Sequence, residues 1–265
     1  MLGDFSSEWV KLRRRSMLLW GLGGGLLFAL LATIFTIERA VRSPAQIFGH
    51  GGGVRVTFAV LERPDGLTHG VVDASGLIGI VALCLFAGAF ATEYSQGTMR
   101  NLLVREPRRM RLLAGKFLAL AVFIGLAVVL EILVSCAVAF ILAPGRGIST
   151  GAWTSSAGLA DLGQATLHVF LACVGYGVLG AAFGVLLRSP GVAIGTAVAY
   201  ILPGEAIIVG AIWSNGDNWL PGRLLDALAH GGNDSSTYSH ALAMVAIYAA
   251  AAAAGTLWLF RHRDA

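Results

Sequence analysis

Six long stretches of almost uncharged, apolar sequence restrict what this chain can fold into. A helix needs about 20 mostly apolar residues to cross roughly 30 Å of hydrocarbon. The stretches run approximately over residues 17–37, 71–91, 117–142, 166–187, 192–213 and 241–260. Their apolar residues are continuous rather than alternating, which indicates transmembrane helices and not the strands of a membrane barrel. We predict an all-α, polytopic membrane protein, with residues 1–265 forming a single transmembrane domain.

The overall composition supports a membrane protein. Hydrophobic residues make up 56% of the chain and charged residues only 13%, whereas an ordinary soluble domain is about one quarter charged. The chain therefore has too little charge to cover the surface of a soluble enzyme. Disorder is excluded as well, because disordered segments combine low hydrophobicity with high net charge.

Lys and Arg are concentrated on one side of the predicted membrane. Thirteen of the nineteen basic residues fall in the N-terminal segment, the connection after the second stretch, the turn at Arg188 and the C-terminal tail. Cytoplasmic connections carry the excess of Lys and Arg in membrane proteins. We therefore predict a multi-pass protein of the plasma (inner) membrane of a prokaryote, with both termini cytoplasmic. Topology and attraction to membrane lipid explain the net charge of +4, so no nucleic-acid partner is needed.

Two segments outside the stretches have an amphipathic pattern. In residues 1–16, Phe5, Trp9 and Leu12 share one helical face and precede three arginines, which predicts a helix lying on the cytoplasmic membrane surface. Residues 214–240 include a Pro221-Gly222 turn followed by a helix-like apolar run. This pattern fits a short re-entrant or interfacial helix at the outer side, and a loop anchored by aromatic residues fits equally well.

The connection between the second and third stretches, residues 92–116, has an unusual order of residues. A polar turn with Gly97 leads into a predicted short helix over residues 98–105, which ends at Glu106-Pro107 because the residue before a proline disfavours helix. Leu102 and Leu103 lie on one side of this helix, as in helices that dock in a groove on a partner.

This connection resembles the coupling loop of the type 2 ABC exporter permeases. The resemblance is carried by an acid, a Gly-Thr pair, a leucine-containing helix, a proline, arginines and a lysine that enters the next span. In this sequence they are Glu93, Gly97-Thr98, Leu102-Leu103, Pro107, Arg108-Arg109 and Lys116. An N-terminal segment with Glu8, Lys11 and Arg13, six spans and a Leu220-Pro221 turn before the last span are also similar to that family.

The resemblance implies a permease that is half of a transporter. Two copies of this chain, or this chain with a related permease, would form the pathway, and two cytoplasmic ABC ATPase subunits would drive export. The loop helix would be the coupling helix that sits on the ATPase. Pro107 and Arg108 would fix the angle at which the chain leaves the coupling helix. The residues that would contact or orient the ATPase are Glu93, Gly97, Thr98, Arg100, Leu102, Leu103 and Arg105. A loop that is basic only for topology would explain the arginines but not the other residues.

The chain itself contains no nucleotide-binding loop. Its only Gly-Lys pair, Gly115-Lys116, has no glycine five residues before Gly115 and is followed by Phe117, so it does not match a phosphate-binding loop. We therefore expect no enzymatic activity and no cofactor in this chain, with ATP and magnesium bound by the partner ATPase.

Two carboxylates are expected inside the membrane, Glu131 in the third stretch and Glu205 directly after Pro203-Gly204 in the fifth. A buried charge is costly in a membrane, so each side chain should face the bundle interior or a cavity. Both positions, together with Pro203 and Gly204, are candidates for the substrate pathway or gate, and an interhelical hydrogen bond is the alternative. An ion-coupled transporter that uses these carboxylates is the alternative function. An intramembrane serine protease is a weaker third class, since no Ser/His pair is evident.

Glycines four residues apart occur three times in the predicted spans. This spacing lets helices approach closely, and it favours helix packing within the chain or at a dimer seam between the first and fifth spans. The pairs are Gly21 and Gly25, Gly180 and Gly184, and Gly191 and Gly195.

Overall fold

The computed structural model describes residue 9 and residues 15–42, 56–95 and 109–262. The all-α expectation is confirmed for these residues, which form helices and no named strand. Six helices are long and apolar enough to cross a membrane, as the sequence predicts. They cover Met17–Glu38, Ser75–Glu93, Ala114–Arg146, Ser156–Leu187, Pro190–Ile207 and Tyr238–Gly255. In lipid, helices of this kind satisfy their backbone hydrogen bonds internally.

The long helices are joined by short helical segments. The long elements are α2 (Arg15–Glu38), α5 (Ser75–Ser95), α7 (Arg109–Arg146), α8 (Ser156–Leu187) and α12 (Tyr238–His262). Between α2 and α5 lie α3 (Phe58–Leu61), η2 (Pro64–Leu67) and α4 (His69–Asp73), and η3 (Gly151–Thr154) precedes α8. The chain between α8 and α12 forms α9 (Pro190–Ala199), η4 (Tyr200–Gly204), α10 (Glu205–Ile207), η5 (Ile208–Ile212), η6 (Ser214–Asn218) and α11 (Pro221–Ala229).

The spans differ from their predicted bounds, most of all the fourth, which begins at Ser156 rather than near residue 166. The second begins at Ser75, because the residues before it, including the charged Asp73, form the separate helix α4. The fifth ends at Ile207 rather than near Trp213, because its last residues belong to wider π turns.

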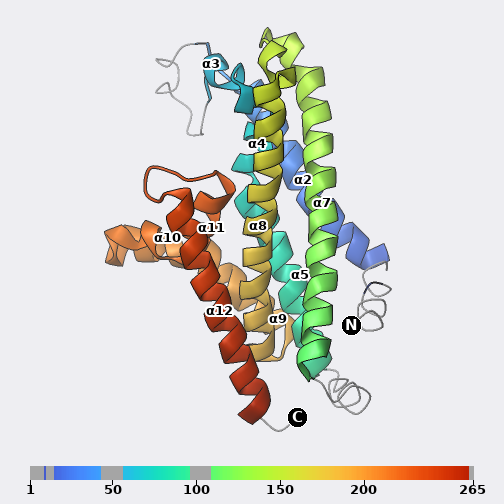
Figure 1. The fold of residues 1–265 in the computed structure, drawn as a ribbon, viewed down its shortest axis with the longest axis vertical. Coiled ribbons are helices and arrows are strands. Elements are labelled where there is room, and N and C mark those ends of the chain that lie inside the picture. The colour runs from blue at the N-terminus through green and yellow to red at the C-terminus, as the bar shows by residue number, and fades with distance from the viewer. Residues whose placement is uncertain (1–8, 10–14, 43–55, 96–108, 263–265) are drawn as a thin grey trace.

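The most extensive helix contact in the bundle is between α5 and α8, and glycines make it close (Figure 1). A β-carbon at Gly180 would lie 2.2 Å from the carbonyl oxygen of Leu83, and one at Gly184 would lie 2.6 Å from that of Ala87. Only glycine permits this approach, so the Gly180/Gly184 pair packs helices within the chain.

The next most extensive contact is between α2 and α7. A β-carbon at Gly21 would lie 2.9 Å from the ring of Phe123, and one at Gly25 would lie 2.0 Å from Oε1 of Glu131. The first glycine pair therefore also serves packing within the chain. Gly191 and Gly195 on α9 differ, since nothing lies within 4 Å of a β-carbon built at either position.

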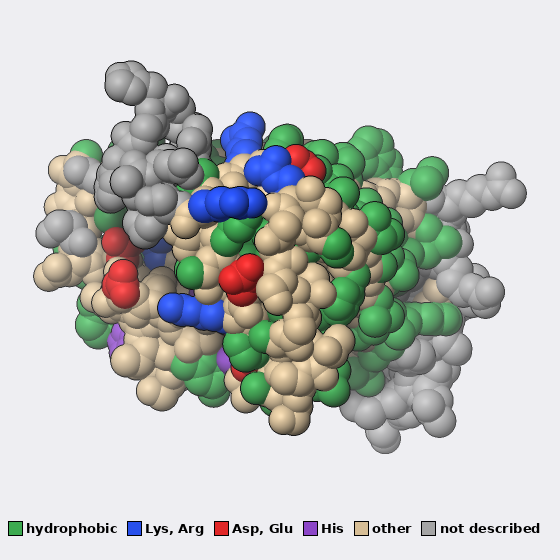
Figure 2. Space-filling view, turned by 90° about the horizontal axis from the view of Figure 1, so that it is seen from above, with side chains coloured by type: hydrophobic (Ala, Val, Ile, Leu, Met, Phe, Trp, Pro, Cys, Tyr) green, Lys and Arg blue, Asp and Glu red, His purple; other side chains and the backbone are tan. Residues whose placement is uncertain are grey.

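The bundle has two distinct ends. We call the end with the start of α7 and the end of α5 the loop end; α2 begins and α12 ends toward the same side (Figure 1). At the opposite or far end, Arg146 Nη1 donates to Glu38 Oε2 at 3.2 Å, and the Trp153 indole N–H donates to the Leu61 carbonyl at 2.7 Å. Figure 2 looks onto the far end and shows charged side chains gathered there, with hydrophobic side chains along the flank.

The fifth span departs from the bundle direction. Arg188 ends α8 with a left-handed φ of 55°, and Pro190 begins α9 at once, which turns the chain sharply. After α9, the segment η4, α10 and η5 projects from the side of the bundle (Figure 1). Its apolar side chains are largely uncovered, with Ile207 60% and Ile212 77% exposed.

Two predicted helices lie outside the described residues. The amphipathic helix of residues 1–16 is described only at Trp9 and from Arg15 onward, and residues 96–108 contain the whole predicted coupling helix. Both helices stay predictions.

Candidate functional site

A buried ion pair joins the two ends of the connection between α5 and α7. Glu93 lies in the last turn of α5, and Lys116 lies two turns into α7. The Lys116 ammonium is 2.5 Å from Glu93 Oε1, and the side chains are only 4% and 9% exposed, respectively. The structure thus brings together the first and last residues of the loop motif.

An aromatic ring lies beside the pair. Lys116 Nζ also lies 5.4 Å from the ring centroid of Phe90, one turn before Glu93, in a geometry that adds a cation–π attraction. Burial makes the two side chains mutually dependent, because removing one takes a neutralising contact from a charge in a low-dielectric site, at a cost of about 3–5 kcal/mol. The pair therefore holds α5 and α7 together where the chain leaves and re-enters the bundle.

The other predicted coupling residues cannot be placed beside this pair. They lie in residues 96–108, outside the described part of the chain. They are Gly97, Thr98, Arg100, Leu102, Leu103, Arg105, Pro107 and Arg108. Their roles stay predictions.

Glu205 is bound to the N-terminus of α11. Its side chain is buried, and its two oxygens accept hydrogen bonds from the backbone N–H groups of Gly222 at 2.9 Å and Arg223 at 3.0 Å. The first N–H groups of a helix have no partner inside the helix, and the helix dipole favours negative charge there. The carboxylate is therefore satisfied by backbone, and an interhelical hydrogen bond accounts for its burial. A gating role stays a prediction.

Pro203 and Gly204 do not stop the helix but widen it. The Glu205 N–H donates to the Tyr200 carbonyl, five residues earlier, which is a π turn. A second π turn follows over Ile208–Ile212, where the Trp213 N–H donates to the Ile208 carbonyl at 2.7 Å. Such insertions kink helices, and here they direct Glu205 toward α11. Gly222 makes room for the carboxylate, since a β-carbon there would lie 2.6 Å from Glu205 Oε2.

Glu131 has a different environment. It lies on α7 against Gly25 of α2 and is 2% exposed. Its Oε2 atom and the hydroxyl of Ser135, one turn along, have no hydrogen-bond partner within the part of the chain that the structure describes. The structure does not bring Glu131 to the Glu205 site, because the two carboxylates belong to separate helix pairs.

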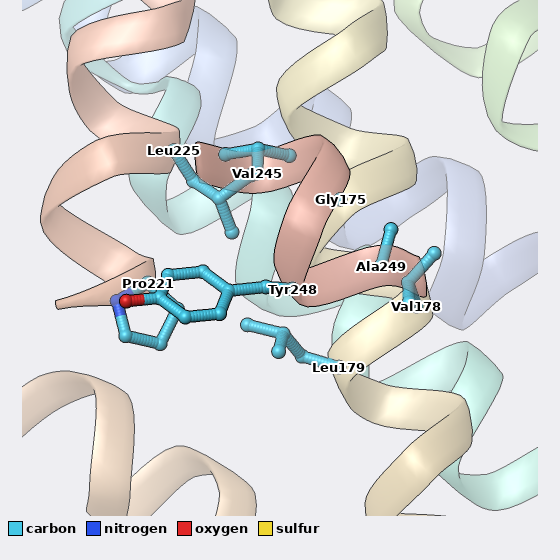
Figure 3. A pocket seen from close by; sticks show the side chains of 8 residues that line it. All are labelled: Gly175, Val178, Leu179, Pro221, Leu225, Val245, Tyr248 and Ala249. Atoms are coloured by element: carbon cyan, nitrogen blue, oxygen red, sulfur yellow. The ribbon is translucent and has the colours of Figure 1, made fainter. Parts of the chain in front are cut away.

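A small apolar recess lies beside α11. Figure 3 shows side chains from α8, α11 and α12 around it, among them Leu179, Leu225 and Val245. Next to it, the Tyr248 hydroxyl donates to the Trp219 carbonyl at 2.5 Å. On the α8 side, the Tyr176 hydroxyl donates to the Gly222 carbonyl at 3.4 Å. These bonds fix the start of α11 against α8 and α12.

The partners of Glu205 and His230 cannot be identified from the sequence. The spacing between Glu205 and Gly222 is not a local motif, and nothing in the loop after Pro221 identifies its amides as the partners of a carboxylate. The same is true of His230 at the end of α11, which lies near Asp73 of α4. The sequence indicated only that Glu205, as a buried carboxylate, needs some hydrogen-bond partner.

The described side chains of the site form contacts between helices. No group of three or more His, Cys, Asp or Glu among them is arranged to hold a metal ion. The site's two main contacts are a buried ion pair at the loop end and a carboxylate that ties the fifth span to α11. These are contacts through which one helix can move another.

Comparison with known proteins adds a family assignment. Residues 29–265 match the family described as "Protein of unknown function (DUF2705)". No curated protein matches the chain. The match covers most of the sequence, including all the helices that form the Glu93–Lys116 pair and the Glu205 site. The chain therefore belongs to the DUF2705 family.

Proposed function

We propose that this chain is the membrane-spanning permease subunit of an ATP-driven ABC exporter. Two permease chains form the pathway, and two separate cytoplasmic ATPase subunits supply the energy. The observation that carries the proposal is the buried Glu93–Lys116 pair, which closes the connection whose residue order resembles a coupling loop. A partner that pushes on this connection would move α5 and α7 as one unit.

The packing of the bundle supports transmission beyond the loop. Through the contact at Gly180 and Gly184, α5 is fixed to α8, and through the contact at Gly25, α7 is fixed to α2. Close-packed helices transmit displacement because the interior has few voids. A displacement at the loop end would therefore reach four of the six spans.

The fifth span offers a surface for the second permease chain. Gly191 and Gly195 on α9 have open space where a β-carbon would be, and Ile207 and Ile212, in the segment that follows α9, are exposed. Small residues on a membrane helix permit close approach of another helix. A second copy at this surface, with lipid on the remaining apolar flank, agrees with a dimeric pathway.

The energy source follows from the same proposal. The chain has no phosphate-binding loop, so ATP and magnesium bind the partner ATPase. The basic residues between the second and third spans support an orientation with the loop end and both termini on the cytoplasmic side of the plasma membrane.

Purification from the native membrane tests this function. The tagged full-length protein is extracted in mild detergent, and bound proteins are identified by mass spectrometry. The proposal expects a soluble subunit with a phosphate-binding loop in about equal amount to the permease, and ATP hydrolysis by the complex. Recovery of the folded permease without any such subunit would refute it.

Loop variants sharpen that test. Leu102→Asp puts a charge on the apolar side of the predicted coupling helix and should release the ATPase, whereas Asn101→Asp adds the same charge on another side and should not. Gly97→Pro alters the turn before that helix and should leave the protein inserted but uncoupled. Equal retention of the ATPase by all three variants would contradict the assigned loop role.

One observation favours a second candidate, an ion-coupled transporter. Glu131 is buried in α7 with an oxygen that lacks a hydrogen-bond partner among the described residues, and intramembrane carboxylates of this kind carry protons in transporters. Glu205 is the weaker proton site, since two backbone N–H groups bind it. Proton uptake by proteoliposomes under a pH gradient, without ATP and abolished by Glu131→Gln, would favour this candidate over the exporter.

A further inference from the structure

Helix α11 is held at both ends by carboxylates from other parts of the chain. Glu205 binds its first amides, as described above. At the opposite end, His230 directly follows the helix, and its Nε2 atom lies 3.5 Å from Oδ1 of Asp73. Asp73 ends α4, the short helix that leads into α5. The His230 contact therefore connects α11 to α4, directly before the second span.

Both ring nitrogens of His230 face oxygen atoms that can only accept. Nδ1 lies 2.9 Å from the Asp226 carbonyl oxygen and 3.6 Å from the Asp226 carboxylate, while Nε2 faces Asp73. A neutral imidazole has one N–H and can serve only one of these sides, whereas the imidazolium has two and serves both. The geometry therefore selects the protonated ring.

The charge balance around the ring has the same effect. The contact with Asp73 raises the pKa of His230 to about 9, with Asp226 adding to the rise and burial opposing it. The ring is thus charged at neutral pH and loses its charge only in alkaline solution.

Other titratable groups near this end do not replace these partners. From α4, His69 Nδ1 lies 3.7 Å from the same Asp73 oxygen. From α8, His168 packs beside Gly231 and stacks on Tyr238 of α12 with ring centroids 4.5 Å apart. His240 of α12 is hydrogen-bonded to the Ser236 hydroxyl at 3.0 Å.

Charged groups on the neighbouring elements lie away from His230. At the other end of α11, Asp217 of η6 pairs with Arg223. The only charged residue of α5, Glu93, is at the loop end.

The two attachments of α11 differ in their access to solvent. Glu205 is 1% exposed, whereas the His230 and Asp73 side chains are 29% and 33% exposed. The His230 end is therefore open to the surroundings of the protein, while the Glu205 end is enclosed. Loss of the ring proton removes a donor at an accessible contact without disturbing the buried one.

We propose that His230 and Asp73 form a proton-dependent latch that holds the C-terminal end of α11 against α4, the short helix directly before the second span. With the ring protonated, α11 is fixed at both ends. When the proton leaves, or when α4 moves with α5, the C-terminal end is released while Glu205 still holds the start. The helix then pivots about Gly222 and uncovers the apolar recess beneath Leu225 (Figure 3).

This latch goes beyond the proposed function, because it depends on no ATPase and no transported substrate. It would make the position of α11 respond to pH on the far-end side of the membrane. Within an exporter it would couple movement of the second span to movement of α11.

Hydrogen–deuterium exchange of the full-length protein in lipid nanodiscs tests the latch. Exchange of residues 224–230 is followed from about pH 6.5 to 9.5 and corrected for the intrinsic rate at each pH. We expect the protection of residues 224–230 against exchange to fall roughly tenfold over this range in the wild type. The protection of the Gly222 and Arg223 amides should stay the same. The wild-type titration needs no variant, so a folding defect cannot obscure it.

Variants identify the groups that titrate. His230→Gln and Asp73→Asn should show the low protection at every pH, and His240→Gln, which changes a neighbouring histidine outside the latch, should titrate like the wild type. A wild type whose protection does not change with pH would overturn the proposal. So would an Asp73→Asn variant that titrates as the wild type does. Neither result bears on whether an ATPase binds the loop.

Discussion

Breaking the Glu93–Lys116 pair should destabilise the bundle far more than removing both charges together. Glu93→Gln removes the acidic partner of the buried Lys116 ammonium in this contact, and Lys116→Met removes the basic partner of the Glu93 carboxylate. The two side chains are less than 10% exposed, so each single change should lower the free energy of unfolding by about 3–5 kcal/mol. The double variant replaces the ion pair by neutral groups of similar size and should cost much less than the sum, giving a coupling energy of about 2–4 kcal/mol.

The assay is a double-mutant cycle on unfolding by SDS in mixed micelles, followed by circular dichroism. The chain contains a matched control in the Glu38–Arg146 pair at the far end, whose side chains are 46% and 36% exposed. An exposed ion pair contributes about 0–1 kcal/mol, so the cycle of Glu38→Gln and Arg146→Met should show a coupling energy below about 1 kcal/mol. Additive effects of Glu93→Gln and Lys116→Met would refute the claim that the loop end is held by a buried ion pair.

Three further changes follow from the described contacts. Glu205→Ala leaves the amides of Gly222 and Arg223 without their acceptor and should lower the unfolding free energy by about 2–5 kcal/mol, with a smaller loss in Glu205→Gln, as measured by the same SDS titration. Gly180→Ala places a carbon 2.2 Å from the Leu83 carbonyl and should lower the melting temperature, whereas Gly195→Ala meets nothing within 4 Å and should leave it unchanged. The raised pKa of His230, about 9 against about 6.5 when unfolded, contributes stability that is complete below pH 6.5 and lost as pH rises through 9. The melting temperature of the wild type should therefore fall over that window by more than that of His230→Gln.

The sequence predicted the spans well because span length and hydropathy are local properties. A continuous apolar run such as the one that forms α7 can satisfy its backbone in lipid only as a helix. The exact ends were less predictable, since Asp73 forms a separate helix before α5 and the π turns shorten the fifth span. Those features depend on tertiary contacts.

The candidate site was predictable only where a buried group needs a partner. The sequence indicated that Glu205 must be satisfied, but the amides of α11 that satisfy it are brought near by the fold. Glu93 and Lys116 were named from the loop motif, and their contact across the connection could not be derived from spacing. The His230 and Asp73 contact had no signal, because the two residues lie far apart in the sequence and in no recognisable motif.

The proposed function requires that a partner ATPase act on the connection between α5 and α7. Its most direct test is photo-crosslinking in the native membrane, with a photoreactive amino acid in place of Leu102 and, as a control, in place of Leu31, which is 40% exposed on α2. The account predicts that the probe at position 102 captures a soluble subunit with a phosphate-binding loop and that the probe at position 31 does not. A probe at position 102 that captures only lipid or other membrane proteins, in a chain correctly inserted in the membrane, would contradict it.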